Sequence, residues 1–519
     1  MKTLSVAVII LVLFAGTANA GKQVRVIYKN IVNGREVTDG PRTVVESDGS
    51  AVRITVVQRQ PGRLQMPSPL QSSFIDLEGR QFINVADMPD GSRISTVTHF
   101  KDLPSAEIST DFETIAGYKC VRSRVIYFSN TIDIWYTLEA GLAGTPVPAY
   151  GVPEGLVLRI VRNGNNITEA EEVESVRDKG FRVSIPGNRG KEVDRMTFEH
   201  LLREAFVTSV TVFDNAVINW EGEVANPEFG IRDTIYRFAG GTVILKKVIL
   251  PQVHDRYSLF AEVTEYSAGD AYDRTGTVFV IPQGDPVTFI DGLIRGHKSL
   301  PVHTDKHGKD YSGVAATISY RPPVELVRFF TPFGVRNFNE KRTVPGLVWE
   351  DSAFYKQEIT RYLPLLRGEV WIGAFIGNYD RGGHRLSLRL KYYPETREME
   401  FPASPEKWIS SVFNTLPIME MEGQQYGTMF DGDTLSVSVE IPEGLKSLQM
   451  VFITTGHGGW GGGDEFNQKM NELLVDGRRV WSFVPWRSDC GTYRNYNPAS
   501  GNFWNGLSSS DYSRSGWCP

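Results

Sequence analysis

Cysteine and charge of one sign are both scarce in this chain. Its 519 residues include three cysteines, and 55 Lys and Arg against 61 Asp and Glu leave a net charge of −6. The length predicts about three domains, each able to bury a core without metals or many disulfides. Because the chain lacks a basic field, the composition argues against nucleic acid as a partner.

Long stretches with helical periodicity are also scarce, whereas Gly (50), Pro (28) and aromatic residues (11%) are plentiful. This composition predicts an all-β protein with many turns. No short solenoid repeat is present. Beyond the first 20 residues, no stretch is apolar enough to cross a membrane.

The first 20 residues have the features of a processing segment. Met1-Lys2 is positively charged, residues 4–14 are apolar, and Ala18-Asn19-Ala20 forms a small-x-small cleavage site before Gly21. We therefore expect a secretory signal peptide at 1–20. The mature protein would be exported to the periplasm or the cell exterior, without membrane association.

An oxidising compartment predicts that two of the three cysteines pair. Cys490 and Cys518 are the natural couple, because they are near in sequence and share one loop-rich tract. Cys120 is then expected to be a buried thiol beside the strand predicted over 121–126.

Strand-like runs and turn signals divide the chain into blocks. Short strands are predicted from residue 24 to about 162, and a polar tract with an acidic cluster follows. We interpret that tract as a linker or surface face. A helix is predicted over 194–206, and residues 385–393 alternate cleanly as a half-buried antiparallel strand. The predicted division is signal peptide 1–20, β-rich domain 21–165, linker and helix 166–207, first sandwich 208–395 and second sandwich 396–519.

Two tracts have the composition of a functional site. In the first, residues 269–274, a carboxylate stands next to Arg274 at the entrance to a strand. The spacing alone favours a plain turn over an ionised base. The second, residues 455–466, is a glycine-rich loop containing His457, Trp460 and Glu465. It is either a flexible loop or a functional one whose backbone approaches a ligand closely.

Metal and nucleophile signals are weak. His303 and His307 have a metal-like spacing, but no helical pattern aligns the two rings and no third ligand stands nearby. Neither a Gly-x-Ser-x-Gly elbow with its helix nor a phosphate-binding Gly-Lys-Ser/Thr ending is present.

Several patches, in this order and spacing, resemble the peptide-N-glycosidase F family, secreted bacterial amidases that remove N-linked glycans from asparagine. They are Tyr272-Asp273-Arg274 before a strand, Gly463-Asp464-Glu465-Phe466 before another strand, Arg514-Ser515-Gly516-Trp517-Cys518-Pro519 with Cys490 upstream, and the weaker Phe330-Thr331-Pro332-Phe333.

The resemblance implies two eight-stranded jelly rolls packed side by side, with the site at their interface. In a subset of the family an additional bowl-shaped N-terminal domain precedes them, and residues 21–165 would fill that role. The family continues past the Trp-Cys-Pro segment. We therefore expect the second jelly roll to lack its closing strands in a chain ending at Pro519, leaving an unpaired edge.

The resemblance also assigns roles to individual residues. Asp273 matches the principal catalytic acid and Glu465 the supporting glutamate, while Arg274 and Arg514 match the arginines of the site. The family's third acidic residue lacks a clear counterpart, and Asp380 is the nearest carboxylate. Further matches are Tyr379 for a sugar-stacking tryptophan, and Gly463 and Asn467 at the positions of a small disulfide.

The expected chemistry is hydrolysis of the amide between asparagine and the first N-acetylglucosamine of N-glycoproteins and N-glycopeptides. Asp273, ionised beside Arg274, would activate water, and Glu465 would hydrogen-bond the sugar or the tetrahedral centre. Arg514 or Arg274 would stabilise the oxyanion. The supporting residues expected around them are Tyr272, Trp460, Trp517 and His457, the first three as sugar-stacking rings.

The scheme requires neither metal nor cofactor, and we expect a monomer. Two alternatives stay open. One is a non-catalytic glycan-binding or adhesin-like protein on the same jelly rolls. The other is a glycosidase that uses two carboxylates.

Overall fold

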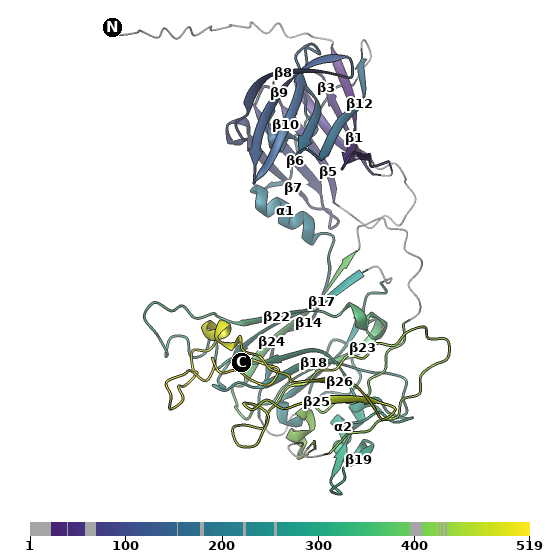
Figure 1. The fold of residues 1–519 in the computed structure, drawn as a ribbon, viewed down its shortest axis with the longest axis vertical. Coiled ribbons are helices and arrows are strands. Elements are labelled where there is room, and N and C mark those ends of the chain that lie inside the picture. Colours follow the sequence, from purple (N-terminus) through teal and green to yellow (C-terminus); the bar gives the residue numbers. More distant parts are fainter. Residues whose placement is uncertain are drawn as a thin grey trace. The chain divides into compact units, whose positions relative to one another are not determined.

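The computed structural model describes residues 22–38, 40–57, 69–152, 154–176, 181–221, 225–253, 257–394, 407–424, 426, 429–430 and 433–519. The predicted signal peptide lies outside these residues, and so do residues 395–406. Internal contacts divide the chain into two units, Met1–Phe206 (unit 1) and Val207–Pro519 (unit 2), each described by itself (Figure 1). Among the described residues, none of the helices is long and apolar enough to span a membrane.

Unit 1 is built on one curved sheet of 13 strands (Figure 1). Its strands are β1 (Gln23–Val32), β2 (Arg35–Glu36), β3 (Arg42–Ser47), β4 (Ala51–Val57), β5 (Leu70–Asp76), β6 (Gln81–Asp87), β7 (Arg93–His99), β8 (Glu107–Ile115), β9 (Tyr118–Tyr127), β10 (Asn130–Thr137), β11 (Leu156–Arg162), β12 (Asn166–Val176) and β13 (Lys191–Glu192). Their order is β13-β7-β6-β5-β4-β3-β1-β12-β11-β10-β9-β8, with β2 on β1. Short 3-10 turns lie at η1 (Phe100–Asp102) and η2 (Pro148–Tyr150).

The free thiol of Cys120 is buried in the core of this sheet, as predicted, beside side chains such as Val26 and Leu158. Burial raises its pKa to about 11. The thiol is therefore protonated at neutral pH and behaves as a small apolar side chain.

The polar tract after residue 165 is a strand in its first part, which corrects its interpretation as a linker. Residues Asn166–Val176 form β12, which pairs with β1 and β11 near the middle of the sheet. Its acidic side chains pair with arginines of the same sheet: Glu169 with Arg159 of the adjacent β11, and Glu171 with Arg42 of β3, one strand beyond β1. The charges that suggested a linker therefore line the polar face of a strand.

The helix predicted over 194–206 is present as α1 (Arg195–Glu204). The side chain of Asp194 accepts a hydrogen bond from the backbone N–H of Thr197, 3.0 Å away. This is the N-cap geometry that satisfies a free amide at a helix start. Phe198 is the buried residue of the helix and packs with Ile94 and Ala86 of the sheet.

Unit 2 begins with two sheets packed face to face. The first, in the order β14-β24-β17-β22, contains β14 (Thr208–Ile218), β24 (His384–Pro394), β17 (Tyr257–Ser267) and β22 (Ala353–Glu358). The second, in the order β15-β16-β23-β18-β21, contains β15 (Ile235–Phe238), β16 (Val243–Leu250), β23 (Gly368–Ile376), β18 (Thr275–Ile281) and β21 (Val324–Phe330). The strand predicted over 385–393 is β24, which alternates as expected between buried leucines and more polar residues.

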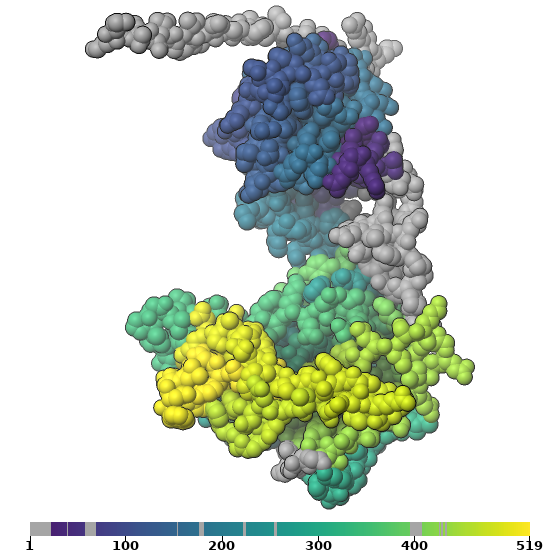
Figure 2. Space-filling model, viewed as in Figure 1, coloured from purple at the N-terminus to yellow at the C-terminus, as the bar shows by residue number. Residues whose placement is uncertain are grey.

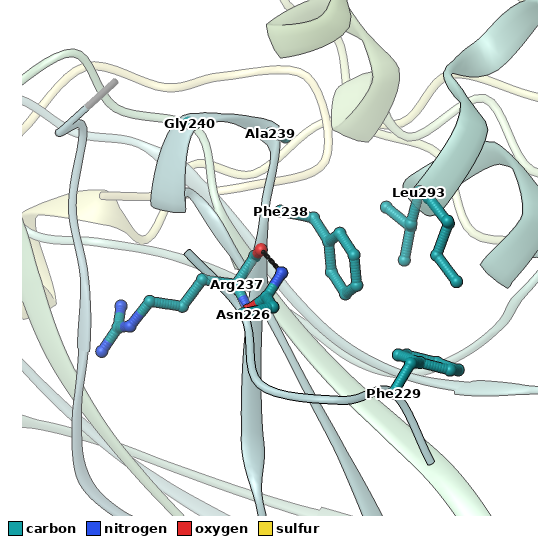
Figure 3. Close-up of a pocket in the computed structure, with 8 residues that line it drawn as sticks. Asn226, Phe229, Arg237, Phe238, Ala239, Gly240 and Leu293 are labelled. Carbon is teal, nitrogen blue, oxygen red and sulfur yellow. Dashed lines mark hydrogen bonds between the residues drawn. The ribbon is translucent and has the colours of Figure 1, made fainter. Parts of the chain in front are cut away.

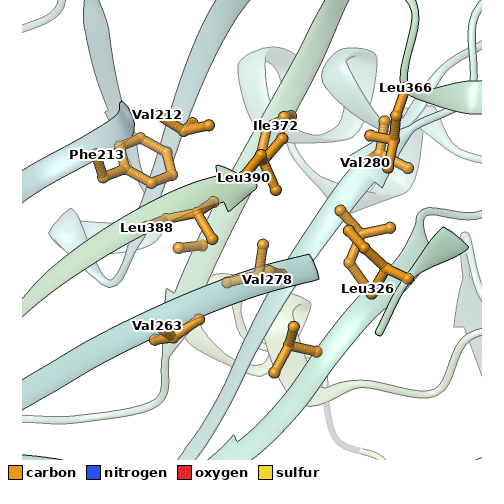
Figure 4. Close-up of a cluster of buried hydrophobic side chains, with 14 of the residues drawn as sticks. Val212, Phe213, Val263, Val278, Val280, Leu326, Leu366, Ile372, Leu388 and Leu390 are labelled. Atoms are coloured by element: carbon orange, nitrogen blue, oxygen red, sulfur yellow. The ribbon is translucent and has the colours of Figure 1, made fainter. Parts of the chain in front are cut away.

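The core of this sandwich is aliphatic. Val263 and Leu388 from the first sheet meet Val278, Leu326 and Ile372 from the second (Figure 4). The outer face of the second sheet is covered as well, by α2 (Phe289–Arg295) and η6 (Pro417–Glu422). Because β18 is buried on both faces, its N-terminal end is a rigid base for the loop that precedes it.

Residues 407–519 contain fewer regular elements in their described part. The strands are β25 (Asn471–Val475) and β26 (Arg478–Phe483), which form a hairpin, and η7 (Cys490–Tyr496) follows. Residues 435–439 alternate between apolar and polar side chains, and residues 448–453 are largely apolar, both patterns typical of strands, but neither stretch belongs to an assigned ladder. The remaining elements of unit 2 are β19 (Val302–Thr304), β20 (Asp310–Ser312), η3 (Ala239–Gly241), η4 (His297–Ser299) and η5 (Thr360–Leu365).

The predicted all-β class is confirmed. The predicted pair Cys490–Cys518 is likewise a disulfide. In Figure 2 the C-terminal segment, in yellow, lies across one face of unit 2.

Candidate active site

The loop between β17 and β18 carries the Tyr272-Asp273-Arg274 motif, and a buried aspartate at its start organises it. The Asp270 carboxylate accepts hydrogen bonds from Arg274 Nε (2.6 Å), Arg274 Nη2 (3.1 Å) and the Tyr272 backbone N–H (3.2 Å). Arg274 is therefore paired bidentately with Asp270, which corrects the expectation that Asp273 is its partner. Burial alone would raise the pKa of Asp270. The hydrogen bonds from His384 and Arg274, together with the positive charges of these two groups, outweigh burial and lower the pKa to about 2.

Thr331, at the end of β21, holds the other side of this loop. Its hydroxyl accepts from the Arg274 backbone N–H (2.8 Å) and donates to the Tyr272 carbonyl (3.2 Å), while its own N–H donates to the Arg274 carbonyl (2.9 Å). The residue between these contacts is Asp273. Its backbone is thus fixed from both neighbours, and its side chain is directed away from Arg274 toward another cation.

That cation is Arg514, one of the most completely buried large side chains of the described chain, with 2% exposure. Its Nη2 lies 3.5 Å from Asp273 Oδ2, and its Nε lies 3.5 Å from Glu465 Oε1. A tight guanidinium–carboxylate contact is about 2.8 Å. The two carboxylates therefore flank one loosely paired guanidinium, which keeps hydrogen-bonding capacity for a ligand.

Aromatic rings fix the plane of Arg514. The guanidinium carbon lies 5.1 Å from the centre of the Phe466 ring and 4.9 Å from that of Trp517. Backbone hydrogen bonds link Arg514 to Arg487 in both directions (2.8 and 3.1 Å), and the Ser515 N–H donates to the Glu465 carbonyl (3.0 Å). The Cys490–Cys518 disulfide closes the loop that ends in this segment.

Burial raises the pKa of both carboxyl groups. For Asp273 desolvation outweighs the opposing charge of Arg514. For Glu465 desolvation acts first and the negative charge of Asp273 second, again against Arg514. Two carboxylates that share one cation in a partly buried place therefore hold a proton more readily than free carboxylates do.

The glycine-rich loop that carries Glu465 is held by side-chain amide and carboxylate contacts. Asn467 Nδ2 lies within hydrogen-bonding distance of the carbonyls of Trp460 (3.1 Å), Gly461 (3.1 Å) and Gly463 (2.8 Å). Asp464 Oδ1 accepts from the Gly458 N–H (2.8 Å). Asn467, one of the residues at the expected disulfide positions, is thus the residue that closes the loop.

Two exposed tyrosines flank Arg274. Tyr272 is 63% exposed and Tyr379 is 66% exposed, and the guanidinium carbon lies 5.1 and 6.0 Å from their ring centres. On the other side of the site, Trp460 is 52% exposed and stacks one face on Phe466 at 4.0 Å. These three rings have surface free for a sugar.

Trp517 differs from the other predicted sugar-stacking rings, because it is buried to 4% exposure. It stacks on Phe330 (4.1 Å) and His457 (5.3 Å), and its Nε1–H donates to the Gly456 carbonyl (2.7 Å). The structure therefore corrects its predicted role: Trp517 supports Arg514 from inside, and a sugar has no open face to stack on.

His457 and Asp380 take structural positions. His457 stacks on Phe330 and Trp517, and its Nε2 lies 3.1 Å from Thr455 Oγ1. Asp380 Oδ1 accepts from the N–H groups of Gly382 (2.7 Å) and Gly383 (2.9 Å), which caps a turn. The recorded contacts of Asp380 are thus those of a turn residue, and they supply no third acid beside Asp273.

Two residues that hold the site, Asp270 and His384, were given no role from the sequence, and Thr331 and Asn467 were named only as members of motifs. The Asp270–Arg274 spacing and a histidine at the start of a cleanly alternating strand are signals that the sequence contains. Neither signal shows that the two residues meet, because Asp270 and His384 lie on different strands' ends and are brought together by the β17–β24 ladder.

A cavity of about 340 Å³ lies elsewhere in unit 2, between η3 and α2 (Figure 3). Phe229, Phe238 and Leu293 line it, and Asn226 Nδ2 donates to the Arg237 carbonyl at its wall (2.7 Å). Within the described chain, its lining includes none of the carboxylates and arginines above. The same part of the structure also contains no group of three or more His, Cys, Asp or Glu placed to hold a metal ion.

Comparison with known proteins gives family matches over most of the chain. Models described as the N-terminal and C-terminal parts of peptide-N-glycosidase F match residues 209–392 and 425–519, and a model described as the N-glycanase peptide N-terminal domain matches residues 26–200. A search of curated proteins found no match.

Two solved structures of PNGF-II, in space groups P21 and C2, are each 37% identical to this chain. They cover 96% of it and 91% and 90% of their own chains, with TM-scores of 0.86 and 0.77. A solved structure of PNGase F, described as a glycosylasparaginase from Flavobacterium meningosepticum, is 15% identical over 60% of this chain and 80% of that chain. Its TM-score of 0.34 is too low to support an argument.

Proposed function

Since this chain belongs to the peptide-N-glycosidase F family, we propose that it hydrolyses the amide that joins an asparagine side chain to the first N-acetylglucosamine of an N-glycan. The observation that carries this proposal is the arrangement of Asp273 and Glu465 on either side of the buried Arg514. A hydrolytic amidase needs a base for water, a charge for the oxyanion and an acid for the leaving nitrogen. These three groups can supply all three functions.

The raised pKa values of the two carboxyl groups allow one of them to act as a base and the other as an acid. One guanidinium faces two carboxyl groups whose pKa values are both raised. One carboxylate can therefore be ionised while the other carries the proton. We assign the ionised state to Asp273, which accepts a proton from the attacking water, and the protonated state to Glu465, which is the hydrogen-bond donor.

In the reaction, the water oxygen forms a bond to the asparagine amide carbon while Asp273 takes its proton. The oxyanion that develops is stabilised by the Arg514 guanidinium, whose loose 3.5 Å contacts leave donors free to turn toward it. The C–N bond then breaks and the nitrogen takes a proton from Glu465. The new carboxylic acid returns a proton to Glu465 and Asp273 releases its proton to solvent, so the products are an aspartate side chain and the glycan as a glycosylamine.

Substrate contacts come from the exposed rings and from Arg274. Tyr272 and Tyr379 on one side and Trp460 on the other offer apolar faces to pyranose rings. Arg274 lies between the two tyrosines, with its charge balanced by Asp270. The disulfide suits an oxidising compartment, so we place the activity outside the cytoplasm, on glycoproteins and glycopeptides.

The experiment uses the purified protein and a defined N-glycopeptide in ¹⁸O-labelled water, with the peptide analysed by mass spectrometry. Conversion of the asparagine to ¹⁸O-labelled aspartate with release of the whole glycan is the expected result. A peptide that keeps one N-acetylglucosamine would show a glycosidase instead. Glycan binding without any cleavage by the folded protein would show a binding module.

Two variants assign the roles within that assay. Asp273→Asn should lower turnover by about 10³-fold or more, and Glu465→Gln by about 10²-fold, because the first removes the base and the second the acid. Asp489→Asn, whose carboxylate pairs with Arg487 in the same segment, is the matched control and should keep activity within about twofold. Full turnover by a folded Asp273→Asn variant would refute the assignment.

A further inference from the structure

A chain of buried ionisable groups lies behind the loop that carries Asp273, and the proposed reaction does not use it directly. His384, at the start of β24, is fully buried, as is Glu265 on β17. His384 Nδ1 lies 2.7 Å from Glu265 Oε1, and its Nε2 lies 3.4 Å from Asp270 Oδ2. Both ring nitrogens therefore face carboxylates.

The chain continues from Asp270 to Arg274 and reaches the surface only there. Asp270 is 2% exposed and pairs with Arg274 through two hydrogen bonds. The Arg274 side chain is the one member of the four with appreciable exposure, and it lies next to the Asp273 backbone and between the exposed rings of Tyr272 and Tyr379. A line of three buried groups thus ends at one partly exposed guanidinium.

The charges of these four groups balance only when the imidazole is protonated, with two carboxylates facing an imidazolium and a guanidinium. The hydrogen bonds to Asp270 and Glu265 raise the pKa of His384 to about 9 in spite of its burial, so the imidazolium is present at neutral pH. The other ionisable group facing Glu265 is Tyr355 of β22, whose hydroxyl donates to the Phe330 carbonyl (2.6 Å).

A buried charge network is an expensive way to fill a core, because apolar side chains of similar volume are often as stable or more so. Its benefit is orientation: a carboxylate held by two cations can turn little. Asp270 also accepts from the Tyr272 N–H, so any turn of its carboxylate would move the Tyr272-Asp273-Arg274 backbone as well.

We propose that His384 is a positioning residue for the reaction: held between Glu265 and Asp270, it fixes the Asp270 carboxylate and through it places Arg274 beside Asp273 for substrate binding and turnover. The inference rests on the proposed function, which supplies the reaction that the positioning serves. A displacement of about 1 Å at a reacting group can cost on the order of 10²-fold in rate.

The test compares His384→Leu and His384→Gln with the wild-type protein by steady-state kinetics on the N-glycopeptide. We expect kcat/KM to fall about 50-fold for His384→Leu, mostly in kcat. We expect a fall of about tenfold for His384→Gln, whose amide can still donate to Asp270. Melting temperature and circular dichroism identify variants that fail to fold.

Asp285→Asn is the matched control. Asp285 and Arg321 form the same bidentate pair, at 2.7 and 2.9 Å, elsewhere in unit 2. Its loss removes a charge-assisted pair away from the site, so it should leave kcat/KM within about twofold. Wild-type kinetics for folded His384→Leu would overturn the proposal, as would an equal loss in Asp285→Asn.

A second measurement does not depend on turnover. In ¹⁵N NMR of the full protein, Arg274 Nε–H, assigned with Arg274→Lys, should give a protected signal that His384→Leu removes. A signal unchanged in His384→Leu would overturn the positioning role. If the wild-type protein proves inactive on glycopeptides, the proposed function fails, and this signal still decides whether His384 positions Arg274.

Discussion

The two proposed catalytic carboxylates stand on loops that are held in different ways. The Asp273 loop is fixed by charge: Asp270, Arg274 and the buried His384 form its anchor, and Thr331 clasps its backbone. The Glu465 loop is fixed by neutral contacts to its backbone, from Asn467, and by the Asp464 carboxylate. The Asp273 half of the site is therefore anchored to the sandwich by buried charges. The Glu465 half is held by hydrogen bonds within its own glycine-rich loop.

Arg514, the arginine between the two halves, should be about as sensitive to substitution as the two carboxylates. We expect Arg514→Lys to lower kcat/KM by about 10²- to 10³-fold, because an ammonium cannot reach both carboxylates or lie flat between Phe466 and Trp517. Arg274→Lys should cost less, about 50-fold, since Asp270 can still pair with the ammonium but only through one contact. Kinetics on the N-glycopeptide measure both, and an equal loss in the two variants would contradict the comparison.

Two glycines of the glycine-rich loop should differ in their tolerance of a side chain. A Cβ at Gly463 would lie 1.9 Å from the Gly458 carbonyl oxygen, whereas a Cβ at Gly461 meets nothing within 4 Å. We expect Gly463→Ala to lower kcat by about 30-fold through displacement of Glu465, and Gly461→Ala to be neutral. Similar kinetics for the two alanine variants would show that the close approach of Gly463 to the Gly458 backbone does not affect catalysis.

Asn467→Ala tests the same loop by removing the side-chain contacts that close it, without adding bulk. Three carbonyl contacts are lost, so we expect kcat to fall about tenfold and the B-factors or NMR line widths of residues 456–467 to rise. The unfolding midpoint of unit 2 should change little, since its main core is the sandwich. A large drop in that midpoint would mean that the loop is part of the core.

The charge-held half should make the stability of unit 2 depend on pH at both extremes. The folded pKa of His384, about 9, exceeds its ordinary 6.5, so its contribution is full below pH 6.5 and is lost as pH rises through 9. The folded pKa of Asp270, about 2, lies below 3.8, so its contribution is full above pH 3.8 and is lost as pH falls toward 2. The change in the free energy of unfolding should be about 3 kcal/mol for His384 and about 2 kcal/mol for Asp270.

Urea unfolding across this pH range, followed by a probe in unit 2, measures the effect. The loss between pH 6.5 and 9 should be smaller in His384→Gln than in the wild-type protein. The Asn467→Ala variant should keep the wild-type pH profile, because Asn467 contacts backbone carbonyls, which do not titrate. An unchanged alkaline slope in His384→Gln would show that another group causes it.

Regular local patterns were enough to predict much of the fold. The alternation over 385–393 corresponds to β24, and the apolar periodicity after Asp194 to α1. The polar composition of 166–176 suggested a linker or a surface face, but these residues form a strand whose glutamates pair with arginines of other strands, Glu169 with Arg159 and Glu171 with the distant Arg42. The alternation over 435–439 is typical of a strand, but these residues belong to no assigned ladder, since a ladder needs a partner strand as well as a pattern.

The site was predictable in its residues more than in its pairing. Asp273, Glu465, Arg274 and Arg514 were all named from motifs, and the structure brings Asp273, Glu465 and Arg514 together. The partner of Arg274 was assigned to the adjacent Asp273 and is Asp270. Trp517 was expected at the surface and is buried, because a ring beside a buried guanidinium is one of its packing surfaces.

The sequence by itself determined the β class and the disulfide pair, because both depend on residue type and short-range spacing, and its resemblance to a family supplied the candidate reactive side chains. Only the tertiary structure decided which charges meet. Asp270 and Asp273 are three residues apart in one loop, yet hydrogen bonds from His384 and Arg274 lower the pKa of the first, while desolvation raises the pKa of the second. Burial and long-range partners set that difference, and both arise when strands and loops far apart in the chain pack together.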